Sequence, residues 1–102
     1  MNVDGTLQDY IVALAEATRN HPDLMLGVSP RGSLALLKGA QAVAAIRARD
    51  YVIPEDIKTL VPLVLAHRLI LKPEAELRGH TARTILENVL EKTALDLGSV
   101  NA

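Results

Sequence analysis

The sequence contains no cysteine, no phenylalanine and no tryptophan, and tyrosine occurs only at Tyr10 and Tyr51. The absence of cysteine excludes a disulfide framework and a thiolate metal site, and it is compatible with a cytosolic protein. With so few aromatic rings, the core must be packed from leucine, isoleucine, valine and alanine. This aliphatic composition favours helices, and 102 residues are enough for one domain with a real core.

The chain also has no excess of either charge sign. It contains 11 Lys and Arg residues and 12 Asp and Glu residues, which gives a formal net charge of −1. This balance argues against a protein that binds nucleic acid by bulk electrostatics. No apolar run reaches the roughly 18 residues of a membrane span, and residues 1–4 lack the features of a signal peptide. We therefore expect a cytoplasmic protein with neither nucleic acid nor membrane as a partner.

Hydrophobic periodicity predicts four principal helices, over residues 4–19, 29–49, 54–71 and from residue 81 or 84 to 93. The first has the clearest buried stripe: Leu7, Tyr10, Ile11, Leu14, Ala15 and Thr18. In the last, Thr84 and Glu87 have the spacing of a capping box. Pro62 lies inside the third helix and should kink or restart it.

The remaining segments are predicted to connect these helices. Residues 24–26 read as a short apolar link, residues 51–53 as an extended piece and residues 72–79 as a polar loop, while residues 94–102 are expected to form a frayed tail. The predicted fold class is therefore all-α, a four-helix bundle with a Pro-kinked third helix.

The most informative stretch, GVSPRGS at residues 27–33, opens the second helix with an arginine. Ser29 can accept the free N–H groups of the first turn, and Pro30 suits the first helical position. The helix dipole repels a cation at this end, so a negative partner explains Arg31 better than helix stability does. Its planar guanidinium can bond two phosphate oxygens at once. From these residues alone, an ordinary surface cation remains the alternative.

The same stretch is not a nucleotide-binding P-loop. Gly27 and Gly32 have the P-loop spacing, but Ser33 and Leu34 follow where that motif has lysine and then serine or threonine. No acidic pair follows a hydrophobic strand either. The chain alone therefore lacks the groups that bind and cleave a nucleotide.

Other candidate residues favour structural roles. The three histidines, His21, His67 and His80, match no zinc-ligand spacing and have no cysteine to support them, so no metal site is expected. Ser29 is better explained as a helix cap than as a nucleophile. Glu55 and Asp56 read as residues of a helix start, with a catalytic acid–base pair as a remote alternative.

Four separated motifs give the chain a family resemblance. They are GVSPR at 27–31, LLKGA at 36–40, RDYVIPEDI at 49–57 and VLAHRL at 64–69. In this order they resemble the C-terminal lid of MoxR-family AAA+ ATPases, over about residues 6–90. The resemblance is specific because all four motifs occur in the right order, whereas any one of them alone would be weak evidence.

The resemblance implies a helical lid domain, residues 1–102, that packs over ATP held by a preceding α/β ATPase core. Arg31 matches the family's sensor-2 arginine, which in the full-length protein would reach the terminal phosphate of ATP and couple hydrolysis to lid rotation. Residues 51–57 would shape the lid, and His67 and Arg68 would serve packing or a subunit interface.

The resemblance also implies cofactors and partners. ATP and Mg²⁺ would act in the full-length protein, with neither expected to bind the isolated fragment. Members of the family typically form hexameric rings and are often paired with von Willebrand factor A-type proteins. They act as chaperone-like ATPases in the activation of complexes such as methanol dehydrogenase. We expect an excised lid that is not itself an enzyme, although its parent would hydrolyse ATP.

Two alternatives stay open. The chain could be a free-standing helical protein-interaction module whose apolar groove receives a partner helix. A helix-turn-helix-like DNA-binding domain is the other, and the acidic balance disfavours it.

Overall fold

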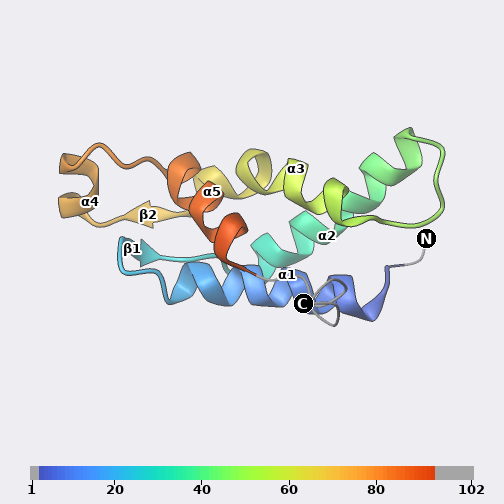
Figure 1. The fold of residues 1–102 in the computed structure, drawn as a ribbon, viewed down its shortest axis with the longest axis horizontal. Helices are drawn as coiled ribbons and strands as arrows, with labels where there is room; N and C mark the ends of the chain where they lie inside the picture. The colour runs from blue at the N-terminus through green and yellow to red at the C-terminus, as the bar shows by residue number, and fades with distance from the viewer. Residues whose placement is uncertain (1–2, 94–102) are drawn as a thin grey trace.

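The computed structural model describes residues 3–93, which form five α-helices and a small two-stranded sheet (Figure 1). The elements are α1 (Gly5–Arg19), β1 (Leu24–Leu26), α2 (Pro30–Ile46), α3 (Pro54–Leu65), β2 (Ile70–Leu71), α4 (Pro73–Leu77) and α5 (Ala82–Lys92). One turn of 3-10 helix, Ala66–Arg68, follows α3 directly. Helix α2 runs obliquely between α1 and α3, and the sheet and α4 lie together at one end of the fold (Figure 1).

One aliphatic core joins α1, α2, α3 and α5. The buried side of α1 is the predicted stripe: Leu7, Tyr10, Ile11, Leu14, Ala15 and Thr18. Helix α2 contributes mainly small residues, and Ala40 and Ala44 are completely buried. These small residues let α3 approach closely, since a Cβ atom on Gly39 would lie 3.1 Å from Leu60 Cδ1. The predicted aliphatic core is therefore confirmed.

The sheet and α4 correct the all-α, four-helix prediction. The apolar link at 24–26 is strand β1, which pairs antiparallel with β2, Leu24 opposite Leu71 and Leu26 opposite Ile70. The polar loop at 72–79 contains the short helix α4, which begins at Pro73. Neither feature has a periodic signal, because two- to five-residue elements are too short for periodicity and the strand pair joins segments distant in sequence.

Two predicted helices end earlier than expected. Helix α2 ends at Ile46, and Ala48 just beyond it has a left-handed backbone (φ 59°). Helix α3 ends at Leu65 and continues through Pro62 without a restart. Val61 and Leu65, each 1% exposed, anchor the two sides of Pro62 in the core, and this burial offsets the hydrogen bond that proline removes.

The start of α5 differs from the predicted capping box. Thr81 is the N-cap residue, and its hydroxyl accepts the N–H of Thr84 at 3.2 Å, while the Thr84 hydroxyl accepts the N–H of Thr81 at 3.0 Å. Glu87 takes no part in this cap. The predicted frayed tail at 94–102 lies outside the described residues. Among the helices of residues 3–93, none has the length and apolar character needed to cross a lipid bilayer.

Candidate functional site

The first turn of α2 places Arg31 at the surface. Ser29 is the N-cap residue, as predicted, and its hydroxyl accepts the N–H of Gly32 at 3.3 Å. Pro30 is the first helical residue and Arg31 the second, with its side chain exposed. Within residues 3–93, no ion pair holds the Arg31 guanidinium. The side chain is thus available to a partner.

The end of α1 fixes the segment that leads into α2. The hydroxyl of Thr18, a residue only 1% exposed, accepts the N–H of Val28 at 2.9 Å and donates to the carbonyl of Ala15 at 2.7 Å. Arg19 Nε donates to the carbonyl of Val28 at 2.9 Å. Both backbone polar groups of Val28 are therefore bonded to α1, which sets where α2 begins.

Gly27 makes this attachment possible. A Cβ atom at Gly27 would lie 2.6 Å from the backbone nitrogen of Arg19 and 2.8 Å from the carbonyl carbon of Thr18. These are backbone atoms that cannot rotate away, so any side chain would push the segment off α1. The glycine of the GVSPR motif thus has a packing role that the sequence alone did not reveal.

The Thr18 hydrogen bond can be tested by Thr18→Val, which keeps the shape of the side chain and removes its hydroxyl. We expect the free energy of unfolding to fall by about 1–3 kcal/mol, because the buried N–H of Val28 loses its acceptor. The measurement is urea denaturation of the 102-residue chain. The exposed Thr59 of α3 supplies the control, since Thr59→Val should change stability by no more than about 0.5 kcal/mol. Equal effects at the two positions would contradict the role of Thr18.

Arg68, in the 3-10 turn, packs beside the same first turn of α2. A Cβ atom at Gly32 would lie 3.3 Å from Arg68 Cδ and 3.7 Å from Leu65 Cδ2. Arg68 Nε is buried and finds no hydrogen-bond acceptor among the described residues. Its neighbour His67 is exposed. The two neighbours therefore differ: Arg68 packs beside α2, whereas His67 is open to the surface.

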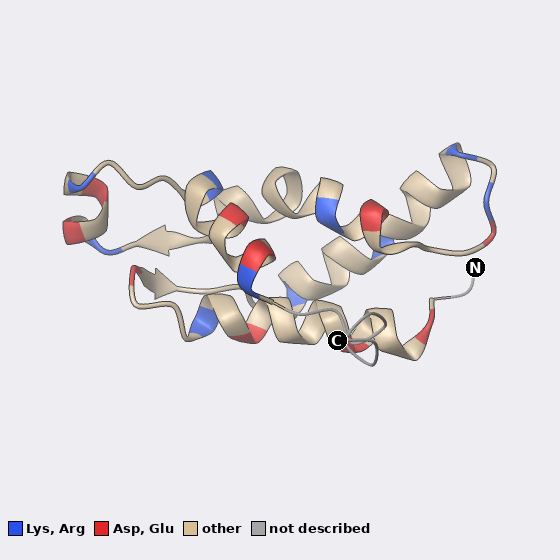
Figure 2. Ribbon diagram, viewed as in Figure 1, with Lys and Arg blue, Asp and Glu red and all other residues tan. Residues whose placement is uncertain are grey.

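Three arginines thus come from separate elements to the start of α2: Arg19, Arg31 and Arg68. In the described part of the chain none of them forms an ion pair with a carboxylate, and the first turn of α2 contains no acidic residue. Elsewhere, basic and acidic residues are interspersed along the ribbon (Figure 2). The positive charge at this helix start is therefore local.

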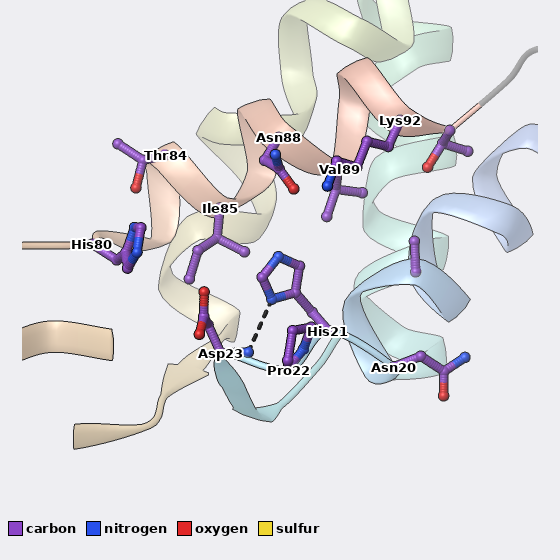
Figure 3. A pocket seen from close by; sticks show the side chains of 12 residues that line it. Asn20, His21, Pro22, Asp23, His80, Thr84, Ile85, Asn88, Val89 and Lys92 are labelled. Carbon is purple, nitrogen blue, oxygen red and sulfur yellow. Dashed lines mark hydrogen bonds between the residues drawn. The ribbon is translucent and has the colours of Figure 1, made fainter. Parts of the chain in front are cut away.

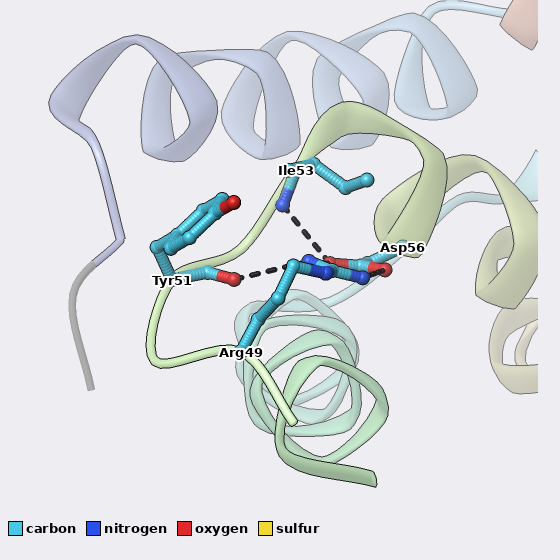
Figure 4. Close-up of polar contacts among 4 residues, drawn as sticks. All are labelled: Arg49, Tyr51, Ile53 and Asp56. Atoms are coloured by element: carbon cyan, nitrogen blue, oxygen red, sulfur yellow. Dashed lines mark hydrogen bonds and ion pairs between the residues drawn. The ribbon is translucent and has the colours of Figure 1, made fainter. Parts of the chain in front are cut away.

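Arg49 and Asp56 form the most buried ion pair described, and they shape the loop between α2 and α3 (Figure 4). The two guanidinium nitrogens bind the two carboxylate oxygens at 2.9 and 2.8 Å, and Asp56 also accepts the N–H of Ile53 at 2.9 Å. Arg49 further donates to the Tyr51 carbonyl at 3.1 Å and lies 5.7 Å from the centre of the Tyr51 ring. Asp56 is thus a helix-start residue, as predicted, and also the partner of an arginine seven positions earlier.

The electrostatics of this pair favour the charged form of both groups. Hydrogen bonds from Arg49 are the main cause that holds the pKa of Asp56 below its ordinary value; desolvation opposes them, and the Ile53 N–H adds to them. The same interaction raises the pKa of Arg49. Through the Tyr51 carbonyl and the Ile53 N–H, the pair holds the loop between α2 and α3 in place.

Two of the histidines line a cleft of about 430 Å³ where the end of α1 faces α5 (Figure 3). His21 extends into this cleft, and its Nδ1 accepts the N–H of Asp23 at 3.1 Å. His80 lies at its edge (Figure 3). Among residues 3–93, no three side chains of the metal-ligating types gather closely enough to hold an ion.

Comparison with known proteins gives concordant results. The family model described as "AAA lid domain" matches residues 16–89. YeaC of Bacillus subtilis (strain 168), named an uncharacterized protein, is 48% identical over 90 residues, which cover 88% of this chain and 28% of YeaC. "Chaperone MoxR1" of Mycobacterium tuberculosis is 36% identical over 102 residues, covering 91% of this chain and 27% of MoxR1.

A solved structure agrees with the sequence relatives. The crystal structure of a protein from Cytophaga hutchinsonii, described as a "putative ATPase", superposes with a TM-score of 0.88 at 36% identity. The match covers 92% of this chain and 31% of that protein. This chain therefore spans less than a third of the length of the proteins that it resembles.

Proposed function

Since this chain belongs to the AAA lid domain family, as the C-terminal lid domain of a MoxR-family AAA+ ATPase, we propose that it closes over ATP bound by the ATPase core of its parent protein. The observation that supports this function is the exposed Arg31 at a helix start that α1 fixes through Thr18 and Arg19. Because the start of α2 is held against α1, a motion of the whole lid would move the Arg31 guanidinium toward or away from a phosphate.

The residues present fit one edge of a nucleotide site. The start of α2 offers a positive dipole end and the exposed Arg31. The described residues hold no group of side chains that could bind a metal ion. The phosphate cradle and the Mg²⁺ ligands would therefore come from the core, and this chain would supply only the lid and Arg31.

In this role Arg31 acts as the sensor-2 arginine. When ATP and Mg²⁺ are bound in the core, they supply the phosphoryl chemistry, and Arg31 contacts the terminal phosphate. Because Thr18 and Arg19 tie the start of α2 to α1, loss of this contact is transmitted to the whole lid. The lid would thus couple hydrolysis to rotation relative to the core.

The wider assembly is also part of the proposal. The parent would act as a chaperone-like remodelling ATPase, with this lid packing against its own core and against neighbouring subunits of a hexameric ring. A von Willebrand factor A-type protein would be the partner. The exposed residues His67 and Leu63 are available for such contacts.

Lid closure can be tested by fluorescence energy transfer in the parent ATPase. Because this chain has no cysteine, Glu16→Cys on the exposed side of α1 gives one labelling position in the lid. With a second dye on the core, transfer efficiency should differ between a non-hydrolysable ATP analogue and ADP. Identical efficiencies in both states would contradict nucleotide-dependent closure.

The isolated 102-residue chain should bind ATP weakly or not at all by calorimetry, because it supplies one edge of the site.

A free-standing interaction module remains the second candidate, favoured by an apolar groove of about 260 Å³ between α1 and α2. Val12 and Leu34, which line it, are 52% and 50% exposed. The native reading frame upstream of the codon for Val3 separates the two functions. A P-loop and an acidic magnesium-binding motif there would support the lid, and a natural start codon with no ATPase before it would support the module.

A further inference from the structure

The groove between α1 and α2 is lined by uncharged residues only: Gln8, Ile11, Val12, Ser33, Leu34 and Leu37. Ile11 belongs to the buried core, whereas Val12 and Leu34, one from each helix, are half-exposed. Single apolar side chains on a protein surface are ordinary. Here, however, two of them line one hollow from different helices, so a partner that filled the hollow would bury both.

Charged side chains border this groove. On α2, Arg31 precedes Leu34 by three residues and Lys38 follows it by four, so these three side chains share one face of the helix. All three are exposed, and in the described part of the chain neither cation forms an ion pair. On α1, the exposed Glu16 follows Val12 by four residues. A complementary surface would therefore be apolar in its centre and acidic where it faces α2.

The small size of the groove, about 260 Å³, indicates how its partner is held. Specific contacts between separate proteins bury roughly 1,200–2,000 Å² of surface, which a hollow lined by a few side chains does not supply. A domain on the same polypeptide is present at a millimolar effective concentration, so a small surface is enough to bind it reversibly. The ATPase core of the parent meets this condition, because this chain is a lid domain that spans less than a third of the length of its relatives.

We propose that the groove between α1 and α2 is the surface on which the ATPase core of the parent docks when the lid closes; this inference rests on the proposed function. Along one face of α2, Arg31 meets the phosphate, Leu34 meets an apolar segment of the core, and Lys38 meets an acidic group beside that segment. Closure then buries Val12 and Leu34. The closed state is thus stabilised by apolar burial as well as by the nucleotide.

The test is the ratio of closed to open molecules, measured by single-molecule energy transfer in the parent ATPase saturated with a non-hydrolysable ATP analogue. The lid dye is attached through Glu91→Cys, an exposed position on α5, which does not line the groove. Leu34→Ser should lower the ratio about 5-fold, because half of a leucine side chain loses its burial in the closed state. The matched control is Leu77→Ser on α4, outside the groove and 87% exposed, which should leave the ratio unchanged.

The charge beside the groove is tested by Lys38→Glu in the same measurement. This reversal should also lower the ratio about 5-fold at low salt, and the loss should shrink at high salt because exposed charges are screened. Lys58→Glu, at an exposed position of α3, reverses the same charge away from the groove. It should leave the ratio unchanged at both salt concentrations.

An unchanged ratio in both Leu34→Ser and Lys38→Glu would overturn the proposal. Loss of ring assembly with closure intact would overturn it too, because a neighbouring subunit would then occupy the groove. If Leu34→Ser does not fold, Val12→Thr tests the opposite wall, since it keeps the shape of valine and adds a hydroxyl group that the core would cover. If the unmodified parent shows no change in transfer with nucleotide, the proposed function itself fails; if it does and the variants match it, only the docking surface is wrong.

Discussion

Arg31→Ala in the parent ATPase is expected to lower kcat for ATP hydrolysis by about 10²–10³-fold, the loss typical when one preorganised donor to a developing charge is removed. The structure gives the reason that the loss should be in turnover and not in folding. Arg31 is exposed, and no ion pair within residues 3–93 depends on it. Arg31→Lys should recover part of the rate, since it restores the charge without the planar fork.

The control for this experiment is Arg47→Ala at the other end of α2. Arg47 is also exposed, and as the C-cap residue it lies far from the first turn. It should leave kcat unchanged. Thermal unfolding of the 102-residue Arg31→Ala chain should match the unmodified chain or slightly exceed it, because the substitution removes a cation from the positive end of a helix dipole. Unchanged hydrolysis in Arg31→Ala would contradict the sensor-2 role.

The parts of the fold that the sequence predicted are those with local signals. The stripe of α1 repeats at helical spacing, so its buried face could be named residue by residue. Ser29 and Pro30 have the chemistry of a helix start, and they occupy that start in the structure. Arg31 could be identified as a candidate for the same reason, because its charge conflicts with the dipole of the helix that it opens.

The remaining features depend on contacts between segments that lie far apart in the sequence. The pairing of Leu24 with Leu71 and the contact of Arg68 with Gly32 both join distant positions. The role of Gly27 depends on how closely α1 passes it. The partner of Asp56 was missed because Arg49 lies across a loop, at a spacing that matches no helical or strand period.

Arg49→Met should have the largest effect on the stability of the 102-residue chain at pH 7. The Asp56 carboxylate is 0% exposed, and removal of its cation leaves a buried charge with only the Ile53 N–H. An uncompensated buried carboxylate of this kind costs about 3–5 kcal/mol, which is a large part of the stability of a small domain. Denaturant unfolding at pH 7 measures the loss, and a loss close to zero would contradict it.

The pH dependence identifies the cause of that loss. In the unmodified chain Arg49 holds the folded pKa of Asp56 below its unfolded value of about 3.9, so the contribution of the pair is fully present above that pH and is lost as the pH falls through the folded pKa. In Arg49→Met, desolvation becomes the largest single influence on the pKa of Asp56 and raises it, against smaller lowering effects of the Ile53 N–H and Arg47. The stability deficit should therefore shrink as the pH is lowered from 7 toward 4. The double variant Arg49→Met/Asp56→Asn keeps an acceptor for the Ile53 N–H without the charge. It should therefore recover most of the loss at pH 7, whereas a deficit equal to that of the single variant would assign the effect to lost packing of the Arg49 stem.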